Sequence, residues 1–277
     1  MEIKQKELKD YFKKRSDVSM AFIFGSYAKG REISESDFDI AIYFKPEGRK
    51  IEWEADKVYA EKSNIWQDLE KIVKKNVDLV ILNNAASTIA FEVLQTGEPI
   101  IIKDKVLYWK FLSQVSFEAI DFRNLVKDYL EIKQRSASLT EKDRVDLLRK
   151  ADFLEGELGD LSKFSGIDQQ IYQSDSSKRR DVERWVENIV NCSIDVAKIL
   201  LASEKRQVPD TYKGLLRSLF LFPGFDKDIA RDLSEFAELR NLLSHEYLDI
   251  RFGQIKKFID EAGCLYGKLL DFIKQIN

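Results

Sequence analysis

The spacing of apolar residues changes once along the chain, and this change constrains the fold more than any other feature. Up to about residue 105, short β-branched or alternating runs lie at 21–24, 38–44 and 77–82, with helix-like stretches between them. Beyond residue 106 the strand pattern almost disappears, and apolar residues recur every three or four positions. We therefore expect an α/β (α+β) domain with a short mixed sheet, followed by an all-α helical bundle.

Two domains also agree with a length of 277 residues, since a domain has about 150 residues on average. The first is predicted at 1–135, with a core at about 18–105 and a trailing helix at 106–135. Ser136-Ala137-Ser138 is a plausible linker. The second domain is predicted at 139–277.

Helices are predicted from residues at helical spacing. In the first domain these are 51–75, where the stripe includes Val58, Trp66, Leu69, Ile72 and Val73, and 83–96, where Gly97 suits a helix end. In the second domain four apolar stripes begin at Leu147, Val182, Ile229 and Ile255 and end at Leu161, Ile199, Leu243 and Leu269.

A single histidine limits the chemistry that one chain can carry. Two-histidine metal sites and zinc fingers of the Cys2His2 type are excluded, so catalysis must rest on carboxylates, on Arg, Lys or Tyr, or on His245 alone. Cys192 and Cys264 are too few for a disulfide framework.

Charge and hydropathy favour a cytoplasmic protein. The net charge of −3 does not favour stable binding to duplex DNA, and no apolar run approaches the ~18 residues of a membrane span. The charged N-terminal stretch also has no apolar signal core.

The segment around Gly25 and Ser26 suits a phosphate-binding turn. It follows the first apolar run and opens a short helix, where backbone N–H groups and a hydroxyl can meet phosphate oxygens. Lys29 and Arg31, in the same loop, are candidate phosphate contacts, and a role as solvated loop charges stays open.

Three aspartates follow in strand-like positions. Asp37 and Asp39 are two residues apart and should point to the same side, while Asp78 lies in the next apolar run. Adjacent carboxylates repel one another unless a cation lies between them, and oxygen ligands suit a hard divalent ion. Three such groups could form a two-metal site.

Gly25-Ser26, ten residues and Asp37-x-Asp39 together resemble the signature of the minimal nucleotidyltransferases, in the polymerase-β-like superfamily. This resemblance covers most of 20–100 and implies transfer of a nucleotide from a nucleoside triphosphate such as ATP. It implies that Gly25 and Ser26 hold the triphosphate and that Asp37 and Asp39 hold Mg²⁺. Asp78 would bind metal and act on the attacking hydroxyl.

The third helical stripe ends in a second group of polar residues that includes Arg240, Asn241 and His245. Arginine can brace a phosphodiester, and histidine titrates in the range useful for acid–base catalysis. Residues five apart on an ideal helix lie about 140° round its axis, so Arg240 and His245 converge only if the helix ends between them or a second chain completes the site.

This group resembles the R-x₄-H motif of HEPN domains, with Asn241 as the polar residue after the arginine. The resemblance covers roughly 139–277 and implies a metal-independent ribonuclease whose site forms between two copies, hence a homodimer or higher homo-oligomer. Tyr247 extends the match to R-x₄-H-x-Y, a form similar to HEPN toxins whose tyrosine is adenylylated by a minimal nucleotidyltransferase antitoxin.

The sequence thus predicts a toxin–antitoxin pair fused in one chain, in which AMP from ATP modifies Tyr247 and silences cleavage of RNA. Two alternatives stay open. One is a small-molecule nucleotidyltransferase similar to aminoglycoside-modifying enzymes, with a helical substrate-binding domain. The other is a non-catalytic nucleotide-binding or interaction protein.

Overall fold

The fold comes from a computed structural model that describes residues 2–28, 37–48, 51–135, 138–245 and 252–276. The chain divides into two compact units, Met1–Asp121 and Phe122–Asn277. The expected domain boundaries at 135 and 139 stay a prediction. In the described part of the chain, no helix combines the length and apolar character that crossing a bilayer requires.

The first unit is built on a four-stranded mixed sheet in the order β3-β2-β1-β4. Its strands are β1 (Val18–Ile23), β2 (Phe38–Phe44), β3 (Val77–Ile81) and β4 (Glu98–Ile102). β1 pairs antiparallel with β2 and β4, and β2 pairs parallel with β3. The fold class is therefore confirmed for this unit.

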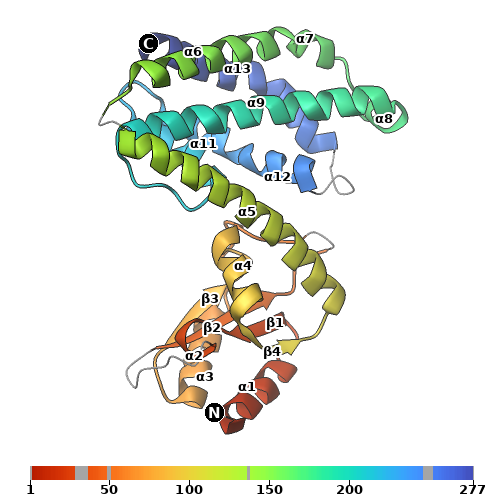
Figure 1. Cartoon of the computed structure of the whole chain (residues 1–277). Helices are drawn as coiled ribbons and strands as arrows, with labels where there is room; N and C mark the ends of the chain where they lie inside the picture. Colours follow the sequence, from red (N-terminus) through yellow and green to blue (C-terminus); the bar gives the residue numbers. More distant parts are fainter. Residues whose placement is uncertain (1, 29–36, 49–50, 136–137, 246–251, 277) are drawn as a thin grey trace. The chain divides into compact units, whose positions relative to one another are not determined.

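Helices cover both faces of this sheet (Figure 1). α1 (Glu2–Lys14) and α3 (Lys62–Val73) pack on one face, where Phe12 and Leu69 are fully buried. α4 (Ser87–Thr96) and the first part of α5 (Lys105–Arg135) pack on the other, with Val93 and Phe111 in the core. α2 (Gly25–Ala28) follows β1 directly.

The predicted helix over 51–75 is wrong in its first half, because only Lys62–Val73 is helical and Val58 is 94% exposed. The earlier residues hydrogen-bond across the chain instead: the Glu52 amide donates to the Tyr43 hydroxyl at 2.8 Å and the Ala55 amide to the Asn83 carbonyl at 3.0 Å. These contacts take the place of the helical hydrogen bonds.

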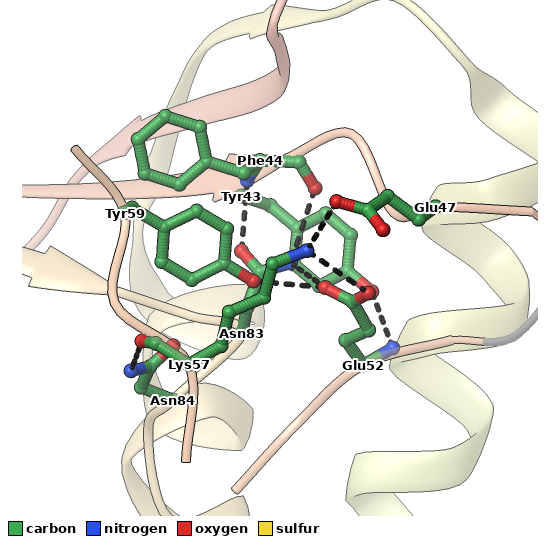
Figure 2. A network of polar contacts seen from close by, with 8 residues as sticks. All are labelled: Tyr43, Phe44, Glu47, Glu52, Lys57, Tyr59, Asn83 and Asn84. Atoms are coloured by element: carbon green, nitrogen blue, oxygen red, sulfur yellow. Dashed lines mark hydrogen bonds and ion pairs between the residues drawn. The ribbon is translucent and has the colours of Figure 1, made fainter. Parts of the chain in front are cut away.

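Buried Asn83 ties the end of β2 to this segment (Figure 2). Its side-chain oxygen accepts from the Phe44 amide at 2.8 Å, and its side-chain nitrogen donates to the Phe44 carbonyl at 3.1 Å and to Glu52 at 3.2 Å. Tyr59 donates to the same Glu52 carboxylate at 2.8 Å, and its ring stacks on Phe44 with centroids 4.4 Å apart. The segment after β2 is therefore held in one place.

The second unit is a helical bundle, as predicted, around α9 (Ser176–Ser203). Most of its core comes from α9, α6 (Glu141–Gly159), α12 (Ala237–His245) and α13 (Phe252–Ile276), together with the second half of α5 (Figure 1). The other elements are α7 (Leu161–Phe164), α8 (Gln169–Ser174), α10 (Tyr212–Arg217), η1 (Ser218–Leu221) and α11 (Lys227–Glu235).

The third predicted stripe is not one helix. It divides at Phe236 into α11 and α12, because the buried Phe236 ring packs edge-on against Phe258 of α13 and its amide closes the last turn of α11 on Leu233. Leu161 of the first stripe also lies in the next helix, α7.

Asp143 joins the start of α6 to the end of α5. This carboxylate is 1% exposed, accepts from Arg135 at 3.1 Å, and forms a capping box with the hydroxyl and amide of Thr140. Removing it leaves the guanidinium and the capping donors without their acceptor.

We expect Asp143→Ala to destabilise the bundle by about 2 kcal/mol, which corresponds to roughly 5 °C in melting temperature. Asp146→Ala in the same helix is the matched control, because its ion pair with Arg149 spans 3.8 Å at the surface. Equal melting temperatures of the two variants, measured by calorimetry, would contradict this role of Asp143.

Candidate functional site

Gly25 allows the turn between β1 and α2. Its φ angle of +68° lies in the left-handed region, and a Cβ atom on it would lie 2.0 Å from Oδ2 of Asp39. Any side chain at this position would therefore meet the carboxylate. The predicted strand–Gly–Ser turn is present, and it lies directly against the predicted Asp-x-Asp pair.

Backbone contacts fix Asp39 beside this turn. The Phe24 amide donates to the Asp39 carbonyl at 3.1 Å, and the Ser26 amide hydrogen-bonds to the Asp39 carboxylate. Asp39 of β2 is also the register partner of Asp78 in the parallel strand β3, so the two side chains lie on one face of the sheet.

The three carboxylates act on each other electrostatically. Burial raises the pKa of half-buried Asp39, the charges of Asp78 and Asp37 raise it further, and the Ser26 amide lowers it. Asp37, just before β2, and Asp78 are exposed. Among the described residues, the side-chain charges that act on the pKa of Asp39 are those of Asp78 and Asp37, and both are negative.

Oxygen donors in this arrangement suit a hard divalent cation, which would relieve the repulsion at Asp39. As they stand, no three His, Cys, Asp or Glu side chains among the described residues are close enough together to hold an ion. A metal role for Asp37, Asp39 and Asp78 therefore rests on their donor chemistry and stays a prediction.

Lys75 and Tyr27 lie next to the turn, and the sequence pattern did not identify them. The Lys75 ammonium donates to the Tyr27 hydroxyl at 2.6 Å, and the Tyr27 ring packs against Phe38 with centroids 4.6 Å apart. The chain brings Lys75 here through a left-handed residue, Lys74, at the end of α3. Lys29 and Arg31 lie outside the described residues.

In the second unit, Arg240 lies in α12 over the face of Tyr212, with 4.3 Å between its guanidinium carbon and the ring centroid. Tyr212 is 4% exposed and packs edge-on against Phe122 at 5.1 Å. A buried ring thus orients the guanidinium through a cation–π contact, which no local spacing could predict.

Helix α12 continues through His245, so it does not end between Arg240 and His245. Within one chain, the two positions therefore stay about 140° apart around the helix axis. The side chains of Asn241 and His245, and the whole of Tyr247, lie outside what the structure describes. A site completed by a second chain therefore stays a prediction.

Two models of known protein families match this chain, one in each of the two regions that carry the motifs. Residues 6–106 match the family model "Polymerase beta, Nucleotidyltransferase", and residues 154–276 match "Ribonuclease HepT-like". A comparison with curated proteins finds no match.

Solved structures with a similar fold include three toxin–antitoxin complexes. One, described as a toxin–antitoxin with AMP-PNP, is 21% identical, covers 46% of this chain and 98% of its own, and has a TM-score of 0.35. The MntA-HepT complex is 17% identical over 47% and 99%, with a TM-score of 0.34. A tri-AMPylated Shewanella oneidensis HEPN toxin with its MNT antitoxin is 20% identical over 46% and 98%, with a TM-score of 0.32.

The two family matches fall on the two regions that carry the motifs, and they confirm the resemblance seen in the sequence. The chain joins a polymerase-β-type nucleotidyltransferase region to a HepT-like, HEPN region.

Proposed function

We propose that this chain is a fused toxin–antitoxin protein, in which the first unit transfers AMP from ATP to Tyr247 and the second is a metal-independent ribonuclease that this modification inhibits. The observation that carries the proposal is the register pair Asp39–Asp78 against the Gly25 turn. The HepT-like match over 154–276, which includes Arg240 and His245, supports the second activity.

For nucleotidyl transfer, the amide and hydroxyl of Ser26 would bind triphosphate oxygens, and Gly25 keeps that approach open. Asp37, Asp39 and Asp78 would hold Mg²⁺, which supplies charge neutralisation on the phosphates when bound. Asp78 takes the proton of the tyrosine hydroxyl, a bond forms between that oxygen and the α-phosphorus, and the bond to the β-phosphate oxygen breaks. The products are AMP-tyrosine and pyrophosphate.

For RNA cleavage, Arg240 would bind the scissile phosphodiester in the orientation that Tyr212 gives it. His245 from a second chain would serve as the acid–base group. A homodimer is thus part of the proposal. AMP on Tyr247, two residues from His245, would place a phosphate and a nucleoside where RNA must enter.

The transferase is tested with purified full-length protein, labelled ATP and Mg²⁺. We expect intact-mass spectrometry to show one or more AMP units, mapped to Tyr247, and no label in Asp37→Ala/Asp39→Ala protein. Tyr247→Phe should lose the label but keep ATP binding. AMP transfer to an aminoglycoside instead of Tyr247 would indicate a small-molecule transferase, and ATP binding without any transfer would indicate a binding module.

Gly25→Ala should reduce AMP transfer by about 100-fold or more, because the new methyl group displaces the Asp39 carboxylate. Gly48→Ala is the matched control: Gly48 has a φ of +88°, but nothing lies within 4 Å of an added Cβ. Both variants carry backbone strain of about 1 kcal/mol, and only one changes the site. Equal transfer rates would show that the approach of Gly25 to Asp39 is not needed.

The ribonuclease should appear when the transferase is inactive. In EDTA, Asp37→Ala/Asp39→Ala protein should cleave RNA, and adding His245→Ala should lower the rate by about 100-fold or more. His245→Ala alone should still accept AMP on Tyr247.

An experiment that mixes two inactive variants distinguishes a ribonuclease site shared between two chains from a site within one chain. Arg240→Ala and His245→Ala chains, each with the inactive transferase and each inactive alone, should recover part of the cleavage when they are refolded together. No recovery in heterodimers that form normally would contradict a site shared between two chains.

A further inference from the structure

A cavity of 450 Å³ lies in the first unit, at the end of the sheet away from the carboxylates. Its walls come from the start of β1, the chain after β2, the chain after β4 and the first turns of α5. The strand register places it there: Val18 pairs with Phe44, whereas Ile23 pairs with Ile40 beside Asp39. Lys45 and Asp39 are thus separated by about 20 Å of strand.

Three lysines line this cavity: Lys45, Lys103 and Lys110. Within the described parts of the chain, none of them has an ion-pair partner, and the Lys103 ammonium donates only to the Arg15 carbonyl. Asp104 is the carboxylate among the lining residues, and its Oδ1 accepts the Leu107 amide at the start of α5 at 3.0 Å. Positive charge here exceeds negative charge.

The 1030 Å³ cavity of the bundle gives a comparison. It is also lined by basic residues, but Asp128, Glu131, Asp146 and Asp195 line it too. Lys150 pairs with Asp195, and Lys198 lies 3.3 Å from Asp128 and 3.2 Å from Asp195. The lysines of the smaller cavity therefore differ from these in having no internal counter-charge.

Polar groups in the same cavity also lack partners. Ser19 is 7% exposed, and none of the described residues hydrogen-bonds to its hydroxyl, while Ser16 adds a second hydroxyl at the rim. Burial lowers the pKa of Lys103, and the nearby charge of Asp17 offsets this only in part. The Ser19 hydroxyl is not among the atoms shut off from solvent, and Lys103 is exposed, so both groups can reach an oxygen-rich anion in the cavity.

The walls are held in place before any ligand arrives. Lys45 follows Phe44, whose backbone is fixed on both sides by Asn83, and its own amide donates to the Asp17 carbonyl at 2.7 Å. Figure 2 shows this network at the end of β2. Its member Glu52 follows the lining residue Ile51 in the chain. Lysines carried on fixed strand ends cost less to order around a ligand.

We propose that this cavity binds a phosphate group, held by Lys45, Lys103 and Lys110 with the serine hydroxyls. Lysine is a common phosphate ligand as a point charge, and the volume admits a group larger than phosphate alone, such as a nucleoside monophosphate or a short phosphodiester. The phosphate can come from a small phosphorylated molecule or from an RNA backbone. The inference does not depend on the proposed function.

Binding of pyrophosphate and of a fluorescent single-stranded RNA, each without divalent metal, tests the site in the full chain. Relative to wild type, Lys45→Gln/Lys103→Gln/Lys110→Gln should raise the dissociation constant of at least one probe about tenfold. Loss of pyrophosphate binding identifies a small phosphorylated ligand, and loss of RNA binding alone identifies a phosphodiester backbone. The three lysines form no ion pair among the described residues and Lys103 loses one exposed hydrogen bond, so the melting temperature without ligand should fall by about 3 °C or less.

Lys6→Gln/Lys9→Gln/Lys62→Gln makes the same charge change on exposed lysines of the same unit and should bind both probes like wild type. Because the proposed Ser26 turn also binds phosphate oxygens, the cavity site is judged from the difference between these two triple variants. If the two triple variants weaken probe binding equally, the effect is explained by net charge alone and the proposal is contradicted. Unchanged binding of both probes by the cavity variant, or no binding by wild type at millimolar pyrophosphate and micromolar RNA, would overturn the proposal.

Discussion

The contact between the Asp39 carboxylate and the turn at Gly25 is the constraint on which the candidate site depends. An added Cβ would lie 2.0 Å from Oδ2, so this turn and this carboxylate coexist only with glycine at position 25. Two backbone hydrogen bonds, from Phe24 and Ser26 to Asp39, join the end of β1 to the start of β2. The turn proposed to bind phosphate and the carboxylate proposed to bind metal are thereby parts of one piece of sheet.

This arrangement has an electrostatic cost. Asp39 is half-buried beside Asp78 and Asp37, and both neighbours raise its pKa instead of lowering it. These are oxygen donors of the kind that hard divalent cations prefer, and a bound cation would turn the repulsion into attraction. The proposed metal role of Asp39 rests on this chemistry.

The sequence predicted the parts of this site but not their contact. The spacing of Gly25, Ser26 and Asp39 could be counted, whereas the register of Asp39 with Asp78 depends on the parallel crossover through α3. Strand β4 was missed because it is short and begins Glu98-Pro99, and proline is tolerated there since the strand lies at the sheet edge.

In the bundle, too, the sequence predicted elements but not the contacts between them. Its long stripes predicted α9 and α13, but the break at Phe236 is set by ring packing between helices.

The net charge of −3 supported an argument against stable DNA binding, yet it says little about local fields. At one end of the sheet the charges of Asp37 and Asp78 act on Asp39, and at the other end three lysines line a cavity without ion-pair partners among the described residues. About 20 Å of strand separates the two ends, whereas the Debye length is about 8 Å at physiological salt. Salt therefore screens the charges at each end from those at the other. One small sheet can thus attract a cation at one end and an anion at the other while the whole chain stays nearly neutral.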